Sequence, residues 1–548
     1  MRTLVIGLDG AEWNVINPLI EKGLLPNVKG LISSGSAGDL VSSIPPITPC
    51  AWASFLTGVN PGKHGIFSYQ KKLKKESSYF VSPLNSLDIH SEHLWHILGR
   101  HGKKVSFVNV PMSFPPQQVN GCMITGMMTP STESKFTYPD ALKKELSDNG
   151  INYRIDLEIS KEVNLLEDQS FHDKYFLKDR GEKFFTELYD ITDQRFRAMK
   201  YLMANKQWDF FMGVFIGMDR VQHYLWKYLE DGLNGEMSAI AEKIFDYYSY
   251  LDGILGEIVL LAGDNTITMV MSDHGFGKYK GDFLVNRWLL DQGLLADNKQ
   301  NQKFIPWIKN IAHRAGLRSE MLYKFFGQKK VNSLRMSTQQ IDWSSSKAFS
   351  VLSHGIHLNV KGRETMGCVE KGAEYDELRD RLIDGLYKIK DPSTGKPIIK
   401  KVYKREDIYN GSEFDDAPDL IILSSDTDHY GIYSSRHSHD DIFYKNTWKT
   451  GDHRQNGIFI VKGQGVKKNY EINNAYIIDV LPTILYMNDL PVPEHVDGKV
   501  LKEIFVDASR KILRETGSEQ RPQDDIYDYG EDEAEDVKDR LKQLGYID

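Results

Sequence analysis

Carboxylate side chains follow three separate apolar runs of the sequence, at the point where each run ends. Asp9 follows LVIGL, Asp219 follows FFMGVFIGM, and the pair Asp273-His274 follows TITMVMS. If these runs are parallel strands of one open sheet, their carboxyl ends meet at the edge where ligands of such sheets bind. Carboxylates and imidazoles are metal ligands, so the three runs together predict a metal site at that edge.

Asp219 and His223, in the motif MDRVQH, are four residues apart. This spacing places both side chains on one face of a helix, where they can share one ion. An isolated Asp-x-x-x-His pair is equally often a surface or capping pair, so the spacing alone does not establish a site. A mixed carboxylate and imidazole set suits Zn²⁺, whereas an oxygen-rich set suits Mn²⁺ or Mg²⁺ equally well.

Thr48 stands directly before Pro49 in IPPITPCAWASFL. A hydroxyl residue followed by proline is typical of a helix N-cap, so a purely structural role is open to Thr48. The same position also favours catalysis, because a helix N-terminus stabilises an alkoxide and a neighbouring metal ion would lower the pKa of the hydroxyl. Cys50 is a competing nucleophile, but no base is paired with it in the sequence, and packing is its expected role.

The apolar runs also predict the elements that position these residues. Strands are expected in TLVIGLD, KVSFVNVP, FFMGVFIG, TITMVMSD, DLIIL and GIFIVKG, and helices in segments such as EKIFDYYSYLDGILGEIVLLAG. This alternation predicts a doubly wound α/β fold around a mostly parallel sheet. Residues 285–345, which are rich in Lys and Arg, and residues 354–420 are interpreted as two inserted cap segments.

Composition and charge limit the classes of protein. The chain has 548 residues with 41% hydrophobic and 26% charged residues, as in a globular protein, and its net charge of −8 argues against nucleic-acid backbone binding. No apolar run reaches membrane-spanning length, so no membrane partner is expected. Three scattered cysteines are too few for a disulfide framework, and a cytoplasmic location is expected. The acidic run from Asp524 to Glu535 predicts a solvated linker.

The motifs GLDGAEW, PPITPCAWASFLTGVNPGKHGIF, GMDRVQHYLW, MSDHGFG and GDHRQNGIFIVKGQG occur in this order along the chain. Together they resemble the alkaline phosphatase superfamily, and within it the type I phosphodiesterase/nucleotide pyrophosphatase family, in particular its predicted phosphohydrolase/phosphomutase group. The resemblance extends from residue 4 to about residue 501. It implies an alkaline-phosphatase-like three-layer α/β/α catalytic domain over residues 1–505, followed by an acidic C-terminal tail with a short terminal helix over residues 506–548.

The resemblance also implies two divalent metal ions, expected to be Zn²⁺ with Mn²⁺ or Mg²⁺ as alternatives, that share an oxygen of a phosphoryl group. The ligands that it implies are Asp219, His223 and His453 for one ion, and Asp9, Asp273, His274 and the Thr48 hydroxyl for the other. His437 and His439 in SSRHSHDD compete for the position of His453. The run GIFIVKGQG that follows His453 favours His453.

Neighbouring residues are given structural interpretations first. His64 is expected to stabilise a turn, and His354 to be a hydrogen-bonded structural histidine, although the second cap segment could bring it to the site. Arg220 and Lys278 lie beside proposed ligands and could contact substrate oxygens, but surface or ion-paired roles are expected. Ala51 stands where the better-known nucleotide pyrophosphatases carry an asparagine that contacts a phosphate oxygen, so nucleotide specificity is not carried over.

The resemblance implies in-line attack by Thr48 on phosphorus and a phospho-threonine intermediate. A phosphodiesterase or nucleotide pyrophosphatase acting on a small phosphorylated substrate is therefore the expected enzyme. The alternatives are a phosphomutase, or a phosphomonoesterase acting on a sugar or small-metabolite phosphate. A sulfatase is disfavoured because the Cys-x-Pro-x-Arg pattern is absent, and a non-catalytic binding protein because every implied ligand position holds a suitable residue.

Overall fold

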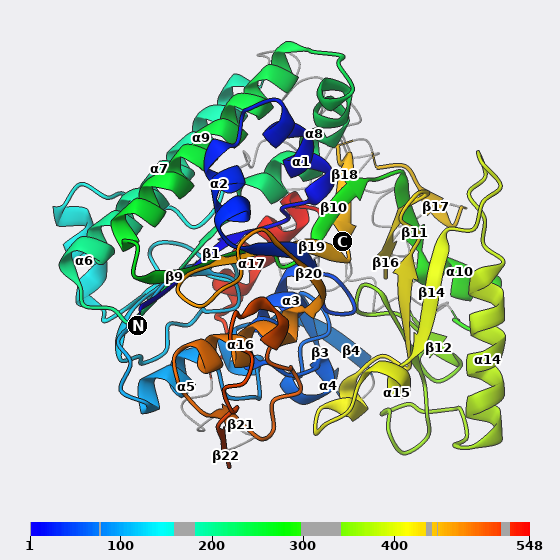
Figure 1. Cartoon of the computed structure of the whole chain (residues 1–548). Helices are drawn as coiled ribbons and strands as arrows, with labels where there is room; N and C mark the ends of the chain where they lie inside the picture. Colours follow the sequence, from blue (N-terminus) through cyan, green and yellow to red (C-terminus); the bar gives the residue numbers. More distant parts are fainter. Residues whose placement is uncertain are drawn as a thin grey trace.

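A computed structural model describes residues 2–75, 78–157, 181–296, 341–434, 441–446, 448–516 and 527–547. Its centre is a nine-stranded sheet (Figure 1) with the order β20 (Tyr470–Tyr476), β2 (Ser36–Val41), β19 (Asn456–Lys462), β9 (Thr266–Met271), β1 (Arg2–Leu8), β8 (Phe210–Phe215), β5 (Val105–Val110), β6 (Gly121–Thr125) and β7 (Thr137–Tyr138). Only β19 and β7 run antiparallel to their neighbours among these strands. The predicted α/β fold with a mostly parallel central sheet is confirmed.

Helices cover both faces of this sheet (Figure 1). One face packs against α1 (Trp13–Glu21), α2 (Pro26–Ser34), α6 (Ala141–Asp148), α7 (Glu182–Asn205), α8 (Gly217–Leu233) and α9 (Ala239–Ala262), and the other against α3 (Thr48–Thr57), α5 (Leu94–Arg100) and α16 (Val480–Met487). Side chains of β8 alternate between the two cores, with Phe211 and Phe215 in the first and Phe210, Met212 and Val214 in the second. Burial on both faces explains why this strand is apolar throughout.

A smaller sheet with its own hydrophobic cluster lies beside the central sheet, at the right of Figure 1. It consists of β12 (Ala348–Phe349), β13 (Gly355–Leu358), β15 (Leu420–Ser424) and β14 (Ile399–Lys404), accompanied by α10 (Val285–Asp291), α14 (Ala373–Tyr387) and α15 (Arg405–Ile408). The run DLIIL is therefore a strand of this smaller sheet. The two expected cap segments both contribute to this cluster, but residues 297–340 lie outside the described residues and the cap boundaries stay a prediction.

Short elements connect these units. They are α4 (Pro61–His64), the hairpin β3 (Gln70–Lys75) with β4 (Ser78–Pro83), the pair β10 (Gly275–Lys278) with β18 (Gly451–Arg454), β11 (Gly281–Leu284) with β16 (Tyr430–Tyr433) and β17 (Phe443–Tyr444), and β21 (Val492–Pro493) with β22 (Arg514–Glu515). The pair β10 and β18 matters most for function. It places a residue of β18 next to the carboxyl edge of the central sheet.

The short terminal helix is α17 (Glu531–Gln543), drawn in red in Figure 1. Its acidic first turn faces outward, whereas Val537, Leu541 and Leu544 are buried in a cluster that includes Ile47 at the start of α3. Before the helix, the hydroxyl oxygen of Tyr529 lies 3.0 and 2.8 Å from two backbone carbonyl oxygens, those of residues 84 and 128, which share its single hydrogen. The described part of the expected solvated linker is thus attached to the central α/β unit.

Candidate metal centre

The first group of metal-type ligands is Asp219, His223 and His453. The Oδ1 atom of Asp219 lies 3.4 Å from Nε2 of His223 and 3.3 Å from Nε2 of His453, and the two Nε2 atoms are 3.0 Å apart. Ligand atoms placed about 2.0–2.1 Å from a tetrahedral ion are about 3.3 Å from one another. These three side chains therefore have the spacing of ligands to one ion.

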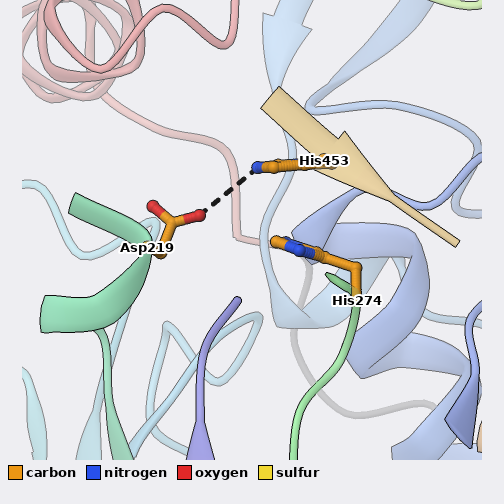
Figure 2. A group of neighbouring side chains, drawn as sticks. All are labelled: Asp219, His274 and His453. Carbon is orange, nitrogen blue, oxygen red and sulfur yellow. Dashed lines mark ion pairs between the residues drawn. The ribbon is translucent and has the colours of Figure 1, made fainter. Parts of the chain in front are cut away.

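The local folding of the chain explains why these side chains meet. Asp219 lies in the first turn of α8, and His223 follows one turn later on the same helix face. His453 is brought from β18, which pairs with β10 so that His453 stands opposite Phe276. Figure 2 shows Asp219 and His453 pointing toward each other, with His274 beside them. His437 and His439 lie outside the described residues.

The second group is Asp9, Asp273 and His274, which follow β1 and β9. Nε2 of His274 lies 3.3 Å from Oδ2 of Asp273 and 3.7 Å from Oδ1 of Asp9. The ring of His274 stacks on that of His453 with centroids 3.7 Å apart, so the two groups are adjacent. Because β1 lies between β8 and β9 in parallel register, these three neighbouring strands bring every member of the two groups except His453, which comes from β18, to one edge.

The histidine tautomers are suited to binding cations. Nδ1 of His223 lies 3.2 Å from the carbonyl oxygen of Gly451, and Nδ1 of His274 lies 3.1 Å from that of Gly275. A ring nitrogen that donates to a carbonyl leaves the lone pair of the other nitrogen available for a metal. Burial also lowers the pKa of His453 to about 4 and holds the pKa values of His223 and His274 below their usual range, so all three rings are neutral at pH 7.

Several buried carboxylate oxygens of the two groups have no hydrogen-bond partner among the described residues. Both oxygens of Asp9, Oδ1 of Asp219 and Oδ2 of Asp273 are buried without a hydrogen-bond partner in the described part of the chain. Burial and the charge of Asp219 raise the pKa of Asp9 to about 8, and burial with neighbouring carboxylates raises the pKa of Asp273 well above its usual range. Unpaired buried charge is costly, so this donor set fits two divalent cations.

Thr48 lies within reach of the second group. Its Oγ1 is 3.2 Å from Nε2 of His274, and the hydroxyl of Tyr69 lies 3.5 Å away on the other side. The helix α3 begins at Thr48 itself, its N-cap is Ile47 in an extended conformation, and no side chain makes a capping hydrogen bond. The N-cap interpretation of Thr48 was therefore wrong by one position, and its hydroxyl is not used by the helix.

The sequence profile of the type I phosphodiesterase/nucleotide pyrophosphatase family matches residues 3–456, which include every candidate ligand. The chain belongs to this family. Phosphonoacetate hydrolase from Sinorhizobium meliloti 1021 has a similar fold, with 14% identity, a TM-score of 0.50, and coverage of 88% of this chain and 94% of that chain. Human ectonucleotide pyrophosphatase/phosphodiesterase 5 is 12% identical, with a TM-score of 0.47 and coverage of 92% and 100%.

The search of curated proteins found no match. Among the helices that the structure describes, none combines the length and the apolar character needed to cross a membrane. At 14% identity and a TM-score of 0.50, the similarity to phosphonoacetate hydrolase shows the fold alone and leaves the substrate of this phosphodiesterase-family chain open.

The other candidate residues have structural partners. His64 is buried, contacts Oγ of Ser54 through Nε2 at 3.0 Å, and accepts a hydrogen bond from the backbone N–H of Ile66 through Nδ1. Cys50 is buried, and burial raises the pKa of its thiol to about 12, which suppresses nucleophilic reactivity. Lys278 is exposed and pairs with Glu230 at 3.3 Å. None of these three residues belongs to the two ligand groups.

A pocket opens beside the first ligand group. It is lined by His354, Lys449, His453, Arg454, Tyr69 and Tyr546, together with residues of the smaller sheet and of β16. His354 therefore reaches the site from the smaller sheet, while its Nδ1 lies 3.4 Å from the carbonyl oxygen of Ile422. Asp452, next to His453, forms a further group of possible ligands with His223 and His453 but is already paired with Lys449 at 2.8 Å.

Sequence reasoning missed Tyr546, whereas the ion-paired role expected for Arg220 is confirmed. The hydroxyl of Tyr546 donates to Oδ2 of Asp219 at 2.6 Å, and Arg220 is fully buried in ion pairs with Asp156 and Asp219. Because the tail is rich in acidic residues, it was predicted to be solvated, and a contact between Tyr546 and Asp219 was not expected. The spacing of Val537, Leu541 and Leu544, at i, i+4 and i+7, is a signal that could have revealed a helix packed on the core.

Proposed function

We propose that the chain is a metal-dependent phosphohydrolase of the phosphodiesterase type, with Thr48 as its nucleophile. The observation that carries this proposal is the position of the Thr48 hydroxyl, which is 3.2 Å from His274 at the start of a helix and beside two groups of buried metal-type ligands. A binding protein has no need of a nucleophile between two cation sites. Family membership supports the same reaction class.

The candidate residues have separate roles in the proposed phosphoryl transfer. Asp219, His223 and His453 would hold one cation, and Asp9, Asp273 and His274 the other. The two cations, expected to be Zn²⁺ because imidazole ligands are present in both groups, would supply the positive charge that stabilises the transition state and lowers the pKa of the hydroxyl. The Thr48 oxygen, having lost its proton, would form a bond to phosphorus while the P–O bond to the leaving alcohol breaks, and the alcohol departs. Water would then cleave the phospho-threonine, which releases the phosphoryl product and restores the Thr48 hydroxyl. The N-terminus of α3 would add a favourable dipole at the oxygen atoms of the bound phosphoryl group.

The proposal is tested with aryl phosphate monoesters, diesters and phosphonate esters, assayed with Zn²⁺, Mn²⁺ and Mg²⁺ after removal of bound metal. We expect hydrolysis that depends on added metal, and a phosphorylated peptide containing Thr48 after acid quenching and mass spectrometry. Hydrolysis that proceeds fully in chelator, or a metal-loaded protein that hydrolyses none of these esters, would contradict the proposal. Transfer of the phosphoryl group within a sugar phosphate would instead indicate a phosphomutase.

We predict that diesters are hydrolysed with a larger kcat/KM than monoesters. Ala51 has no polar side chain to contact a second charged oxygen, and the nearby guanidinium groups are engaged: Arg220 binds Asp156 and Asp219, and Arg454 donates to three backbone carbonyl oxygens. A missing charge-assisted hydrogen bond costs about 1.5–3 kcal/mol, so we expect roughly a tenfold or larger preference. The measurement compares bis(p-nitrophenyl) phosphate with p-nitrophenyl phosphate, and a larger value for the monoester would contradict the prediction.

A further inference from the structure

The segment that follows α17 places Tyr546 at the metal centre. The ring of Tyr546 is buried and stacks on Tyr69, with centroids 4.6 Å apart and planes 10° from parallel. Its edge faces the ring of His223, with centroids 5.2 Å apart. Tyr546 is 327 positions from Asp219 in the sequence and nonetheless touches it. This contact is outside the ligand sets and outside the proposed reaction.

The hydroxyl of Tyr546 forms a hydrogen bond with one carboxylate oxygen of Asp219. It donates to Oδ2 of Asp219 at 2.6 Å and accepts a hydrogen bond from Nη1 of Arg220 at 2.6 Å. Arg220 also donates to the same Oδ2 atom, and its other nitrogens are held by Asp156 at 3.0 and 2.6 Å. Oδ2 is therefore occupied by two donors, while Oδ1 is left facing the two histidines.

The backbone around Tyr546 is fixed from several sides. The hydroxyl of Tyr224 donates to the carbonyl oxygen of Gln543 at 2.7 Å, and that of Tyr433 donates to the carbonyl oxygen of Gly545. Gly545 has a φ of +73°, and a Cβ atom there would lie 2.2 Å from Cη2 of Trp448. Only glycine combines this backbone conformation with this close approach. These contacts therefore hold the Tyr546 side chain in one position.

We propose that Tyr546 is a positioning residue of the metal centre, which fixes Asp219 so that Oδ1 alone is presented to the ion shared with His223 and His453. This inference rests on the proposed function, because it takes Asp219 as a metal ligand. Groups that hydrogen-bond to a ligand orient it, and their loss typically weakens metal binding by about 10- to 100-fold. The segment after α17 then contributes to metal binding by orienting Asp219.

The test compares Tyr546→Phe with Tyr529→Phe in the full-length chain. Both substitutions remove one tyrosine hydroxyl from the C-terminal segment, but the partly buried Tyr529 hydroxyl contacts the backbone carbonyl oxygens of Leu84 and Met128 and no metal-type ligand. Metal-free protein is titrated with Co²⁺, and its visible absorption and competition with a chelator are measured. We expect Tyr546→Phe to bind one of two ions roughly 10- to 100-fold more weakly, with an altered Co²⁺ spectrum, and Tyr529→Phe to resemble the unmodified chain.

Gly545→Ala provides a second variant, because it displaces Tyr546 while retaining the hydroxyl. The same loss of Co²⁺ affinity in this variant, and recovery of diesterase activity by Tyr546→Phe at saturating metal, would support a positioning role. Unchanged affinity and an unchanged spectrum in Tyr546→Phe would overturn this inference and leave the proposed function standing. An unmodified chain that binds no Co²⁺ or Zn²⁺ would overturn both together.

Discussion

Thr48→Ala will abolish turnover while the protein remains folded. Removal of a covalent nucleophile lowers kcat by at least about 10³-fold in comparable enzymes. The structural cost is small, because the Thr48 side chain makes no helix-capping hydrogen bond, and loss of one methyl group and one hydroxyl from the core costs about 1 kcal/mol. Steady-state kinetics on an aryl diester and thermal unfolding of the same preparation measure the two effects separately.

Thr57→Ala is the matched control for this substitution. Thr57 is a buried threonine at the other end of α3, and its hydroxyl donates to the carbonyl oxygen of Ala53 at 2.7 Å. We expect this variant to lose comparable stability and to keep its activity. Thr48→Ser should retain measurable activity because the hydroxyl is kept. A Thr48→Ala protein with near-normal kcat would show that Thr48 is not the nucleophile.

The second large effect is expected from removal of the Thr48-side ligands. Asp273→Ala and His274→Ala should each lower the metal content from two ions per chain to about one, because both groups contact the same proposed ion. Catalysis should fall by orders of magnitude, since the charge beside the nucleophile is lost. Elemental analysis after dialysis measures the stoichiometry. Unchanged occupancy of both ions in both variants would show that this site is misplaced.

Asp252→Ala is the control for loss of a buried carboxylate. Asp252 lies in α9 and accepts hydrogen bonds from the backbone N–H groups of Asn27 and Val28, at 3.0 and 2.8 Å. This variant should lose stability but keep both ions.

In the unmodified chain, chelation should lower the melting temperature and remove activity. An ion that binds only the folded state stabilises it by about 2.7 kcal/mol when its concentration is 100 times its Kd.

Much of the catalytic core was predictable from local patterns. The runs ending at Leu8, Met218 and Ser272 are rich in apolar residues because β1, β8 and β9 are buried on both faces, and such runs are visible without a structure. A carboxylate or imidazole directly after a buried parallel strand must lie at the ligand-binding edge. The positions of Asp9, Asp219 and Asp273-His274 in one rim follow from that rule.

Some features were harder to place. The cap boundaries and the helix start at Thr48 depend on turns that differ by one or two residues without changing the hydrophobic pattern. His453 was chosen over its neighbours only from the run that follows it. In the structure its position comes from the pairing of β18 with β10, a contact between strands separated by more than 170 residues.

The sequence by itself determined the α/β class, the family, and the residues that stand at strand ends, because each depends on local periodicity or on motifs read in order. The tertiary structure decided which nitrogen and oxygen atoms face one another, and that Asp219 is held by Arg220 and by a tyrosine 327 positions away. Hydrophobic spacing in α17 encodes that one face is buried, but not which surface covers it. Contacts between distant segments depend on how all the elements pack together, so they emerge only when the whole chain has folded.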